Sequence, residues 1–239
     1  SFTQSKMDVD SILELGANHV AMATGSKWRL DLLGIHHRFK DVKIHEPMMI
    51  SPEQIMLGHI PTDHVLIFDD DHYYLGSALA EQLAELGLKV TLVTPAPEVS
   101  GWTHFSLEYG HIQIKLRELG VTIICNHGIA EIGEGFVDLS CVFVGTKHRV
   151  EVNTVVPVTS RISQDDLYYK VLARRQEWQD NGIKSVTRIG DCYAPGTIAM
   201  AVYAGHEFAR NLDMPINADI PFRRENDFES GRSWQGFKT

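Results

Sequence analysis

Three short stretches of this sequence carry residue types that contact nucleotides in proteins. Thr24-Gly25 and Gly190-Asp191 each follow an apolar run, and a third apolar run ends in the acidic stretch 69–71. Glycine lets a backbone approach a pyrophosphate closely, a carboxylate accepts hydrogen bonds from sugar hydroxyls, and a helix N-terminus attracts phosphate. The first two stretches therefore have the groups that a dinucleotide requires, and the third needs separate consideration.

The acidic stretch is unfavourable for phosphate. The residues from Asp69 to Gly76 contain one glycine and three carboxylates, and each carboxylate would cost on the order of 1 kcal/mol or more beside a phosphate. Tyr73 and Tyr74 would obstruct the approach, and Thr94-Pro95 offers no acid or arginine for a ribose. We interpret this region as a nucleotide-binding fold kept as a scaffold. Coordination of a cation by the three aspartates is the alternative.

The other half of the chain keeps more of the required groups. Thr24 and Gly25 can bring backbone close to a dinucleotide, and the helix that begins near Thr197 and Ile198 can direct its N-terminus at phosphate. A purely structural role for the Gly190-Asp191 turn is the alternative. The apolar positions from Ile198 to Leu212 recur at helical spacing, which predicts core packing.

The elements that position these stretches alternate between strand and helix. Residues 64–68 and 89–94 read as buried strands around a helix at 75–86, a unit of the size of a βαβ motif. This alternation predicts an α/β class with a doubly wound, Rossmann-like parallel sheet, and glycine turns between short apolar runs predict an inserted antiparallel meander. The remaining expected segments are a short helix at 9–15, a strand at 19–25, a polar loop at about 26–50, a helix beginning at Ser51, a helix at 106–119, strands at 121–125, 129–132, 136–144, 148–152, 154–159 and 185–189, helices at 165–179 and 197–212, and a polar tail from Asp213.

Composition excludes several classes of function. The 239 residues carry a net charge of −9, and no basic run offers a surface for nucleic acid. No apolar stretch is long enough to span a membrane, and the start does not read as a signal peptide. The three cysteines form no CxxC, the twelve histidines form no ligand spacing, and no GxSxG motif is present. These features predict a reduced, cytoplasmic protein with no metal site and no hydrolase function.

The order of these features resembles that of the glutathione-reductase-type flavoproteins, which contain two dinucleotide folds. Within that superfamily, several motifs are similar to the C-terminal region of trimethylamine and dimethylamine dehydrogenases. The motifs are 51–56, 77–81, 104–109, 177–178, 189–191, 205–206 and 220–225. The resemblance assigns 1–58 to a partial FAD-like domain, 59–153 to an inserted NAD(P)-like domain, and 154–239 to the second FAD-like segment and tail.

The resemblance implies a function for the parent protein. Members of this family carry FMN on a TIM barrel and a 4Fe–4S cluster, oxidise a small methylated amine, and pass electrons to an electron-transfer flavoprotein. Some hold ADP in the FAD-like domain, where the aspartate matching Asp191 binds a sugar hydroxyl. This chain contains neither the barrel, nor the cluster cysteines, nor a first GxGxxG turn. We therefore expect no cofactor and no activity in it alone, assign no catalytic residue, and expect the parent to be a homo-oligomer.

Two rival functions remain open at the level of sequence. The first is a region of an NADPH-dependent enzyme similar to dienoyl-CoA reductase, and the glycine-poor turn at Asp69–Gly76 disfavours it. The second is a free-standing, non-catalytic nucleotide-binding or assembly module, which the length of the natural reading frame would distinguish. The amine substrate and the physiological electron acceptor are not specified by any motif.

Overall fold

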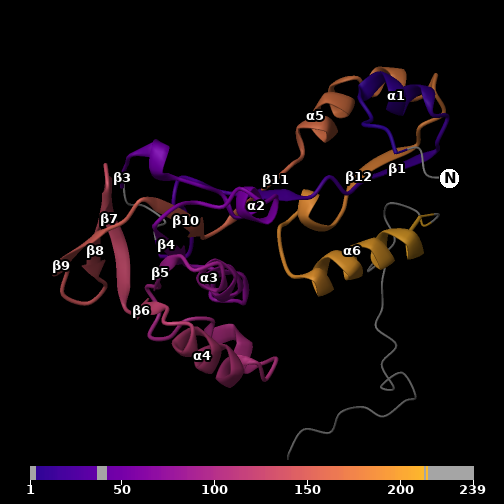
Figure 1. Ribbon diagram of the computed structural model, residues 1–239. Helices are drawn as coiled ribbons and strands as arrows, with labels where there is room; N and C mark the ends of the chain where they lie inside the picture. Colours follow the sequence, from indigo (N-terminus) through magenta and orange to yellow (C-terminus); the bar gives the residue numbers. More distant parts are fainter. Residues whose placement is uncertain (1–3, 37–41, 213, 215–239) are drawn as a thin grey trace, which may run out of the picture. The chain divides into compact units, whose positions relative to one another are not determined.

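The computed structural model describes residues 4–36, 42–212 and 214, so the expected tail and the motif at 220–225 lie outside the described residues. The described chain forms two compact units (Figure 1). Unit 1 contains the described residues of 1–26 and of 163 onward, and unit 2 contains the described residues of 27–162. The division at 58 and 153, which assigns segments to ancestral dinucleotide domains, stays a prediction.

Unit 1 holds a small parallel sheet and the helices that accompany it. Strands β1 and β12 pair in parallel, with His19 opposite Ser185 and Met22 opposite Arg188. The elements are α1 Val9–Glu14, β1 His19–Met22, α5 Asp166–Ala173, the 3-10 turn η3 Arg175–Glu177, β12 Ser185–Arg188, the 3-10 turn η4 Gly190–Cys192 and α6 Ile198–Arg210. The buried side chains of this unit are Ile12, Leu13, Met22, Val171, Trp178, Ile183, Val186 and Cys192.

Unit 2 is built on a parallel sheet in the order β10-β4-β5-β6, with a second sheet in the order β3-β7-β8-β9. The first sheet and its helices comprise β4 His64–Asp69, α3 Leu75–Glu85, β5 Lys89–Val93, η2 Gly101–His104, α4 Tyr109–Glu118, β6 Thr122–Ile124 and β10 Thr154–Val158. The second comprises β3 Lys43–Ile44, β7 His127–Gly133, β8 Phe136–Cys141 and β9 Lys147–Glu151. Between β3 and β4 the chain forms η1 Glu46–Met48 and α2 Pro52–Met56. Strands β7, β8 and β9 are antiparallel, as the expected meander requires.

The chain crosses between the units within two short strands. These are β2, Ser26–Trp28, and β11, Arg161–Ser163, which form a two-stranded sheet. The predicted polar loop at 26–50 is therefore partly wrong, because it contains β2, β3 and η1. It also contains Leu32, which is completely buried.

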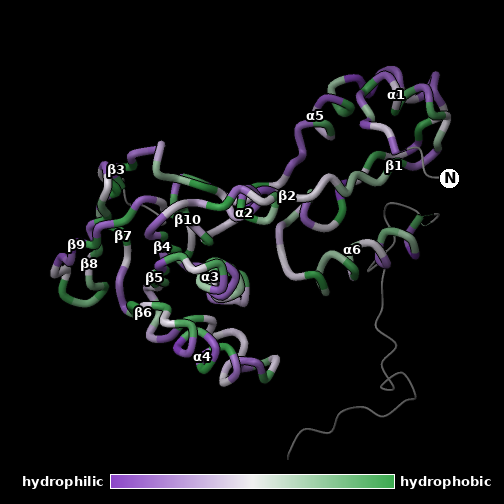
Figure 2. Tube along the Cα trace, viewed as in Figure 1, coloured by the Kyte–Doolittle hydropathy of each residue, from purple (hydrophilic) through white to green (hydrophobic). Residues whose placement is uncertain are grey.

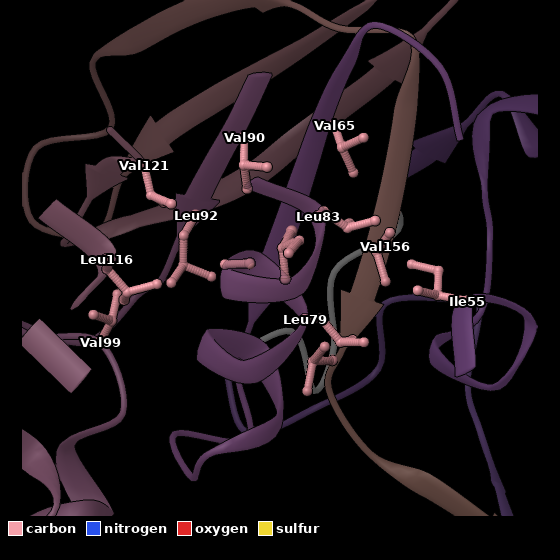
Figure 3. Close-up of a cluster of buried hydrophobic side chains, with 13 residues drawn as sticks. Ile55, Val65, Leu79, Leu83, Val90, Leu92, Val99, Leu116, Val121 and Val156 are labelled. Atoms are coloured by element: carbon pink, nitrogen blue, oxygen red, sulfur yellow. The ribbon is translucent and has the colours of Figure 1, made fainter. Parts of the chain in front are cut away.

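Period-2 alternation divides the core of unit 2 between the two faces of its parallel sheet. Val65 and Ile67 of β4 belong to the cluster that includes helical side chains such as Leu79, which Figure 3 shows beside the strands. Leu66 and Phe68, which point the other way, belong to a cluster with the meander. Both faces are thus covered, which explains why all six residues of β4 are buried.

Local signals place the helix starts where the sequence predicted them. Ser51 is the N-cap of α2, its hydroxyl accepts from the backbone of Gln54, and the Gln54 side chain accepts in return from the backbone of Ser51. This capping box and the proline that follows it fix the beginning of the helix. The α/β class with parallel strands is confirmed.

The prediction that α6 packs into a core is wrong. No described residue of this helix is buried, and Ile198, Met200, Val202 and Tyr203 are each more than half exposed. Figure 2 shows hydrophobic residues along its length. A helix that is apolar on more than one face is normally buried on more than one face, so the described part of unit 1 does not supply all the surface that α6 requires.

Candidate nucleotide-binding site

The candidate site residues from the sequence lie together in unit 1, at the carboxyl ends of β1 and β12. Asp191 follows β12 in η4, and its carboxylate has partners on two sides. Oδ2 accepts from the Ser26 hydroxyl at 2.9 Å, and Oδ1 accepts from the backbone N–H of Gly196 at 3.1 Å. The hydroxyl of Ser163 donates to the Asp191 carbonyl at 2.9 Å. Asp191 therefore ties the start of β2, the end of β11 and the approach to α6 to one another.

These contacts give Asp191 a structural role. A carboxylate oxygen can accept more than one hydrogen bond, so this role does not by itself conflict with a contact to a sugar hydroxyl. The sequence prediction that Asp191 contacts a nucleotide stays a prediction.

Gly190 and Gly25 are required by their backbone conformations. The φ angles are +56° at Gly190 and +78° at Gly25, a region that other residues rarely adopt. A Cβ at Gly190 would also lie 3.5 Å from the Cβ of Ala201 in α6. That distance is an ordinary van der Waals contact, so both glycines are needed for their φ angles and not for space.

The N-terminus of α6 begins directly after this turn. Thr197 is the N-cap, and its hydroxyl accepts from the backbone N–H of Met200 at 3.4 Å. The first backbone N–H groups of a helix have no partner within the helix, and they favour an anion at this end. Ile198 is 75 % exposed, so the first turn is open to solvent in the described chain. Thr197 and Ile198 thus lie where a phosphate could be held, and that role stays a prediction.

Gln164 is a residue that the sequence reasoning missed. Its backbone N–H donates to the carbonyl of Gly25 at 2.9 Å, and its side-chain amide donates to the carbonyls of Thr24 and Ser26, each at 3.3 Å. The Thr24 hydroxyl donates to the Gln164 carbonyl and lies 3.1 Å from Sγ of Cys192. The Thr24-Gly25 backbone is therefore clamped by a residue 140 positions away, a pairing that no local pattern announces.

A second missed group surrounds Arg188, the last residue of β12. Its guanidinium forms an ion pair with Asp165 and lies over the rings of Tyr168, Tyr169 and Tyr193, with its central carbon 4.8, 5.3 and 5.5 Å from their centroids. Such cation–π contacts stabilise a fixed arginine position. The cluster therefore holds β12 to α5 and η4, immediately before the Gly190-Asp191 turn.

The acidic stretch of unit 2 differs from its sequence interpretation in one respect. Asp69 and Asp70 are completely buried and do not line an open surface. Oδ1 of Asp69 accepts from the backbone N–H groups of Asp71 at 3.1 Å and of His72 at 3.0 Å. Complete burial raises the pKa of Asp69 to about 7. The carboxyl group of Asp69 therefore occupies the turn after β4 and takes the backbone N–H groups that a phosphate would need.

His72 compensates part of the buried negative charge. Its Nε2 lies 3.4 Å from Oδ1 of Asp70, and its Nδ1 lies 3.4 Å from the hydroxyl of Thr94. Burial alone would lower the pKa of His72, but the carboxylate of Asp70, with those of Asp69 and Asp71, outweighs burial and raises it. Asp69, Asp70 and His72 thus form an acid–histidine cluster at the carboxyl end of β4.

The described residues contain neither a group of side chains that could hold a metal ion nor a helix that could cross a membrane. Across 4–36, 42–212 and 214, no group of three or more histidine, cysteine, aspartate or glutamate side chains could hold a metal ion. The three cysteines are free thiols, of which Cys192 is buried and Cys125 and Cys141 are partly exposed. None of the described helices combines the length and the apolar character that crossing a membrane requires.

Known proteins are similar to this chain in sequence and in fold. Residues 50–169 match the family described as the OYE-like second alpha/beta domain. Dimethylamine dehydrogenase of Hyphomicrobium sp. (strain x) is 32 % identical over 97 % of this chain and 34 % of its own length. Histamine dehydrogenase from Rhizobium sp. 4-9 is 42 % identical, with a TM-score of 0.87 over 92 % of this chain and 35 % of that chain.

A third relative has a related activity in its name. The 6-hydroxypseudooxynicotine amine oxidase of Pseudomonas geniculata N1 is 37 % identical, with a TM-score of 0.79 over 85 % of this chain and 30 % of that chain. The chain thus spans about a third of the length of these relatives. It belongs to the family of the OYE-like second alpha/beta domain, and within it to the trimethylamine and dimethylamine dehydrogenase branch that its motifs resemble.

Proposed function

We propose that this chain is the nucleotide-binding-like, largely structural region of an iron–sulfur flavoprotein that oxidises a small amine. The names of its relatives support amine oxidation, since they act as dehydrogenases or oxidases on dimethylamine, histamine and 6-hydroxypseudooxynicotine. FMN and the 4Fe–4S cluster belong to the other part of the parent. That part includes the TIM barrel, and an electron-transfer flavoprotein takes the electrons.

The two units correspond in this proposal to a glutathione-reductase-like pair of dinucleotide folds. Unit 1 carries the FAD-like residues, and unit 2 carries the parallel sheet of the NAD(P)-like fold. The exposed apolar residues of α6 support a larger assembly, because the described chain leaves them in water. We propose that the remaining part of the parent covers them.

The observation that carries a nucleotide role is the geometry around Asp191. Its carboxylate is fixed by Ser26 and Gly196, beside a glycine turn and in front of the first turn of α6. A fixed acceptor next to a helix N-terminus suits a ribose hydroxyl and a phosphate in the same ligand. We propose that the parent holds an adenine nucleotide such as ADP against Thr24-Gly25 and Gly190-Asp191, while the chain alone lacks the glycine turn that would hold its pyrophosphate.

The rival that uses NADPH requires an open phosphate turn after β4. In this chain the turn contains the buried carboxyl of Asp69, which accepts from two of its backbone N–H groups. A reductase that takes hydride from NADPH is therefore the less favoured alternative. A free-standing assembly module would have to cover the exposed side chains of α6 with a binding partner of its own.

The test replaces Asp191 in the full-length parent. Asp191→Ala removes a charge-assisted hydrogen bond worth roughly 1.5–3 kcal/mol, so it should lower the adenine nucleotide released on denaturation by about tenfold or more at limiting nucleotide. Amine oxidation at the distant FMN should stay largely intact. Asp180→Ala, which changes an exposed aspartate of unit 1, is the matched control.

Three results would contradict the proposal. The first is nucleotide content in Asp191→Ala equal to that of wild type and control. The second is a nucleotide located on Asp69–Gly76 in place of unit 1. The third concerns the purified 239-residue chain, which we expect to be colourless and inactive. A stoichiometric flavin absorbance band, or dye reduction that depends on amine, would show that the chemistry lies within it.

A further inference from the structure

The parallel sheet of unit 2 has a point at which its strand order reverses. From β4 the chain continues to β5 and then β6 on one side, and β10 returns later to the other side of β4. In open parallel α/β sheets, ligands bind in the crevice at the carboxyl ends of the strands where this reversal occurs, and dinucleotides are common ligands there. In this chain the crevice lies beyond Asp69 and Val158, which are opposite each other in β4 and β10.

The crevice is occupied by the segment Arg29–His36 of the same unit. The backbone N–H of Arg29 donates to the carbonyl of Ser160 at 3.0 Å, just beyond the end of β10. The hydroxyl of Ser160 donates to the carbonyl of Leu33 at 2.5 Å. The backbone N–H of His36 donates to Oδ2 of Asp70 at 2.7 Å, just beyond the end of β4. Both strand ends are therefore tied to this one segment.

The segment is closely packed within the crevice. Leu32 is completely buried and belongs to the same cluster as Phe68 and Val155, although its φ of +62° is unfavourable for a leucine. A Cβ at Gly34 would collide with the carboxylate of Asp70 and would lie 3.1 Å from the Cβ of Thr159. The strained leucine and the required glycine show a segment shaped to this crevice.

The carboxyl group of Asp69 fills the adjoining space at the first turn of α3. The donors that a phosphate would use, the backbone N–H groups of Asp71 and His72, both donate to its Oδ1. Its Oδ2 is buried and has no hydrogen-bond partner among the described residues. A Cβ at Gly76 would lie 2.8 Å from that oxygen, so Oδ2 is directed at the helix where glycine gives it room.

We propose that this crevice is a dinucleotide site occupied by the protein itself. The segment Arg29–His36, anchored by Asp70, takes the place of the ligand body, and the carboxyl of Asp69 takes the place of a phosphate. A vacated crevice would take an adenine dinucleotide, because it would combine a strand-order reversal, a close-approach glycine at Gly76 and a free helix N-terminus. This concerns unit 2 and does not depend on the nucleotide proposed for unit 1.

The first test measures, by deuterium exchange, whether Asp70 anchors the segment Arg29–His36. Asp70→Ala removes the acceptor for the backbone of His36, so the amides of 29–36 should exchange with deuterium about tenfold faster or more, since opening costs less. Asp70→Asn is the matched control, because its side-chain oxygen can still accept from His36, and its exchange in this segment should stay closer to wild type. Unchanged exchange at 29–36 in Asp70→Ala would overturn the assignment of Asp70 as the anchor.

The second test measures binding with NADH as the probe. Calorimetry at low ionic strength compares the wild-type chain with Asp69→Gly/Asp70→Ala, which removes the phosphate substitute and the anchor together. Asp63→Gly/Asp138→Ala is the control, since it removes the same two charges from exposed or partly exposed positions of unit 2 and Asp63 has a φ of +59° that suits glycine. We expect very weak or no binding in wild type and control, and an affinity at least about tenfold higher in the vacated variant.

Two outcomes would overturn the proposal. One is a vacated variant with the circular dichroism of wild type that binds NADH no better than the control. The other is a wild-type chain that binds NADH in the low micromolar range, because an occupied crevice excludes it. If the double variant does not fold, the exchange measurement on Asp70→Ala still decides whether the segment is anchored as proposed. None of these outcomes involves amine oxidation or Asp191, so they leave the proposed function separately testable.

Discussion

Replacing Asp69 with asparagine should make unit 2 less sensitive to pH. Complete burial raises the pKa of Asp69 from the unfolded value of 3.8 to about 7, against the opposing effect of two backbone N–H donors and His72. A carboxyl whose pKa is raised by folding binds its proton more tightly in the folded state. Its stabilising contribution is therefore complete below the unfolded pKa and is lost as the pH rises to the folded pKa. A difference of about three pH units, at 1.36 kcal/mol each, is on the order of 4 kcal/mol.

The neighbouring groups act in the same direction. The pKa of His72 is raised above 6.5 because Asp70, Asp69 and Asp71 outweigh its burial, so its contribution is present below pH 6.5 and is lost as the pH rises through the folded pKa. Burial also raises the pKa of Asp71, and the charge of Arg161 opposes that shift. Wild-type unit 2 should accordingly lose stability as the pH rises from about 4 to about 8.

Asp69→Asn keeps the oxygen that accepts from the backbone of Asp71 and His72 and removes the buried ionisation. At pH 8 the variant should therefore exceed wild type in unfolding free energy by about 2–4 kcal/mol, after an allowance for the buried amide. At pH 5, where the wild-type carboxyl is protonated in the folded state but still mostly ionised in the unfolded state, the difference should be smaller by about 2–3 kcal/mol. The pKa of His72 should fall in the variant, because one of its carboxylate partners loses its charge.

The assay must report on unit 2 alone, since two units need not unfold together. Deuterium exchange at the core amides of β4 and β5, corrected for intrinsic rates, gives the opening free energy between pH 5 and 8.5. Asp63→Asn, at an exposed position just before β4, should reproduce the wild-type pH dependence. Parallel curves for wild type and Asp69→Asn over this range would refute the reasoning, because Asp69 would then carry the same charge in both states.

Three further predictions concern packing, capping and thiol reactivity. Gly76→Ala should lower the unfolding free energy by about 1–3 kcal/mol, because the new Cβ would lie 2.8 Å from the Asp69 carboxyl. Gly110→Ala is the control, because no heavy atom lies within 4 Å of the new Cβ in that helix, and it should be neutral or stabilising. Urea titration of both variants measures the two unfolding free energies. Ser51→Ala should cost about 1 kcal/mol through loss of the α2 capping box, and a Ser51→Thr variant that fell as far would argue against the cap. Cys141, whose pKa is lowered by the backbone N–H groups of Val144 and Phe143, should react with iodoacetamide before Cys125, whose pKa is raised by burial. Cys192 should react only after unfolding, and mass mapping that found it modified in the native chain would contradict its burial.

The sequence was most informative where structure is decided locally. The buried strand β4, the helix α3 and the capping box at Ser51 follow from runs and spacings within one element, and the structure has each of them. The position of the Gly190-Asp191 turn followed in the same way. Each of these features depends on neighbours within a few positions, so a single sequence contains the whole signal.

Features set by distant contacts could not be predicted. Gln164 clamps the Thr24-Gly25 backbone across 140 positions, and Leu32 is buried inside a stretch whose composition is that of a polar loop. The error at α6 has the same origin. Periodicity shows which side chains of a helix would bury together, but whether they are buried depends on surface that another segment supplies.

The order of segments along the chain has a consequence for how the protein is made. Unit 1 combines residues 1–26 with residues from 163 onward, so β1 pairs with a strand that is synthesised after the whole of unit 2. At roughly 5–20 residues per second, β1 leaves the ribosome on the order of ten seconds before β12 exists. Unit 2, which is one continuous segment, can complete its folding in that interval. The small sheet of unit 1 can close only after β12 has been synthesised, so β1 and the apolar side of α1 remain without their partners while unit 2 is made.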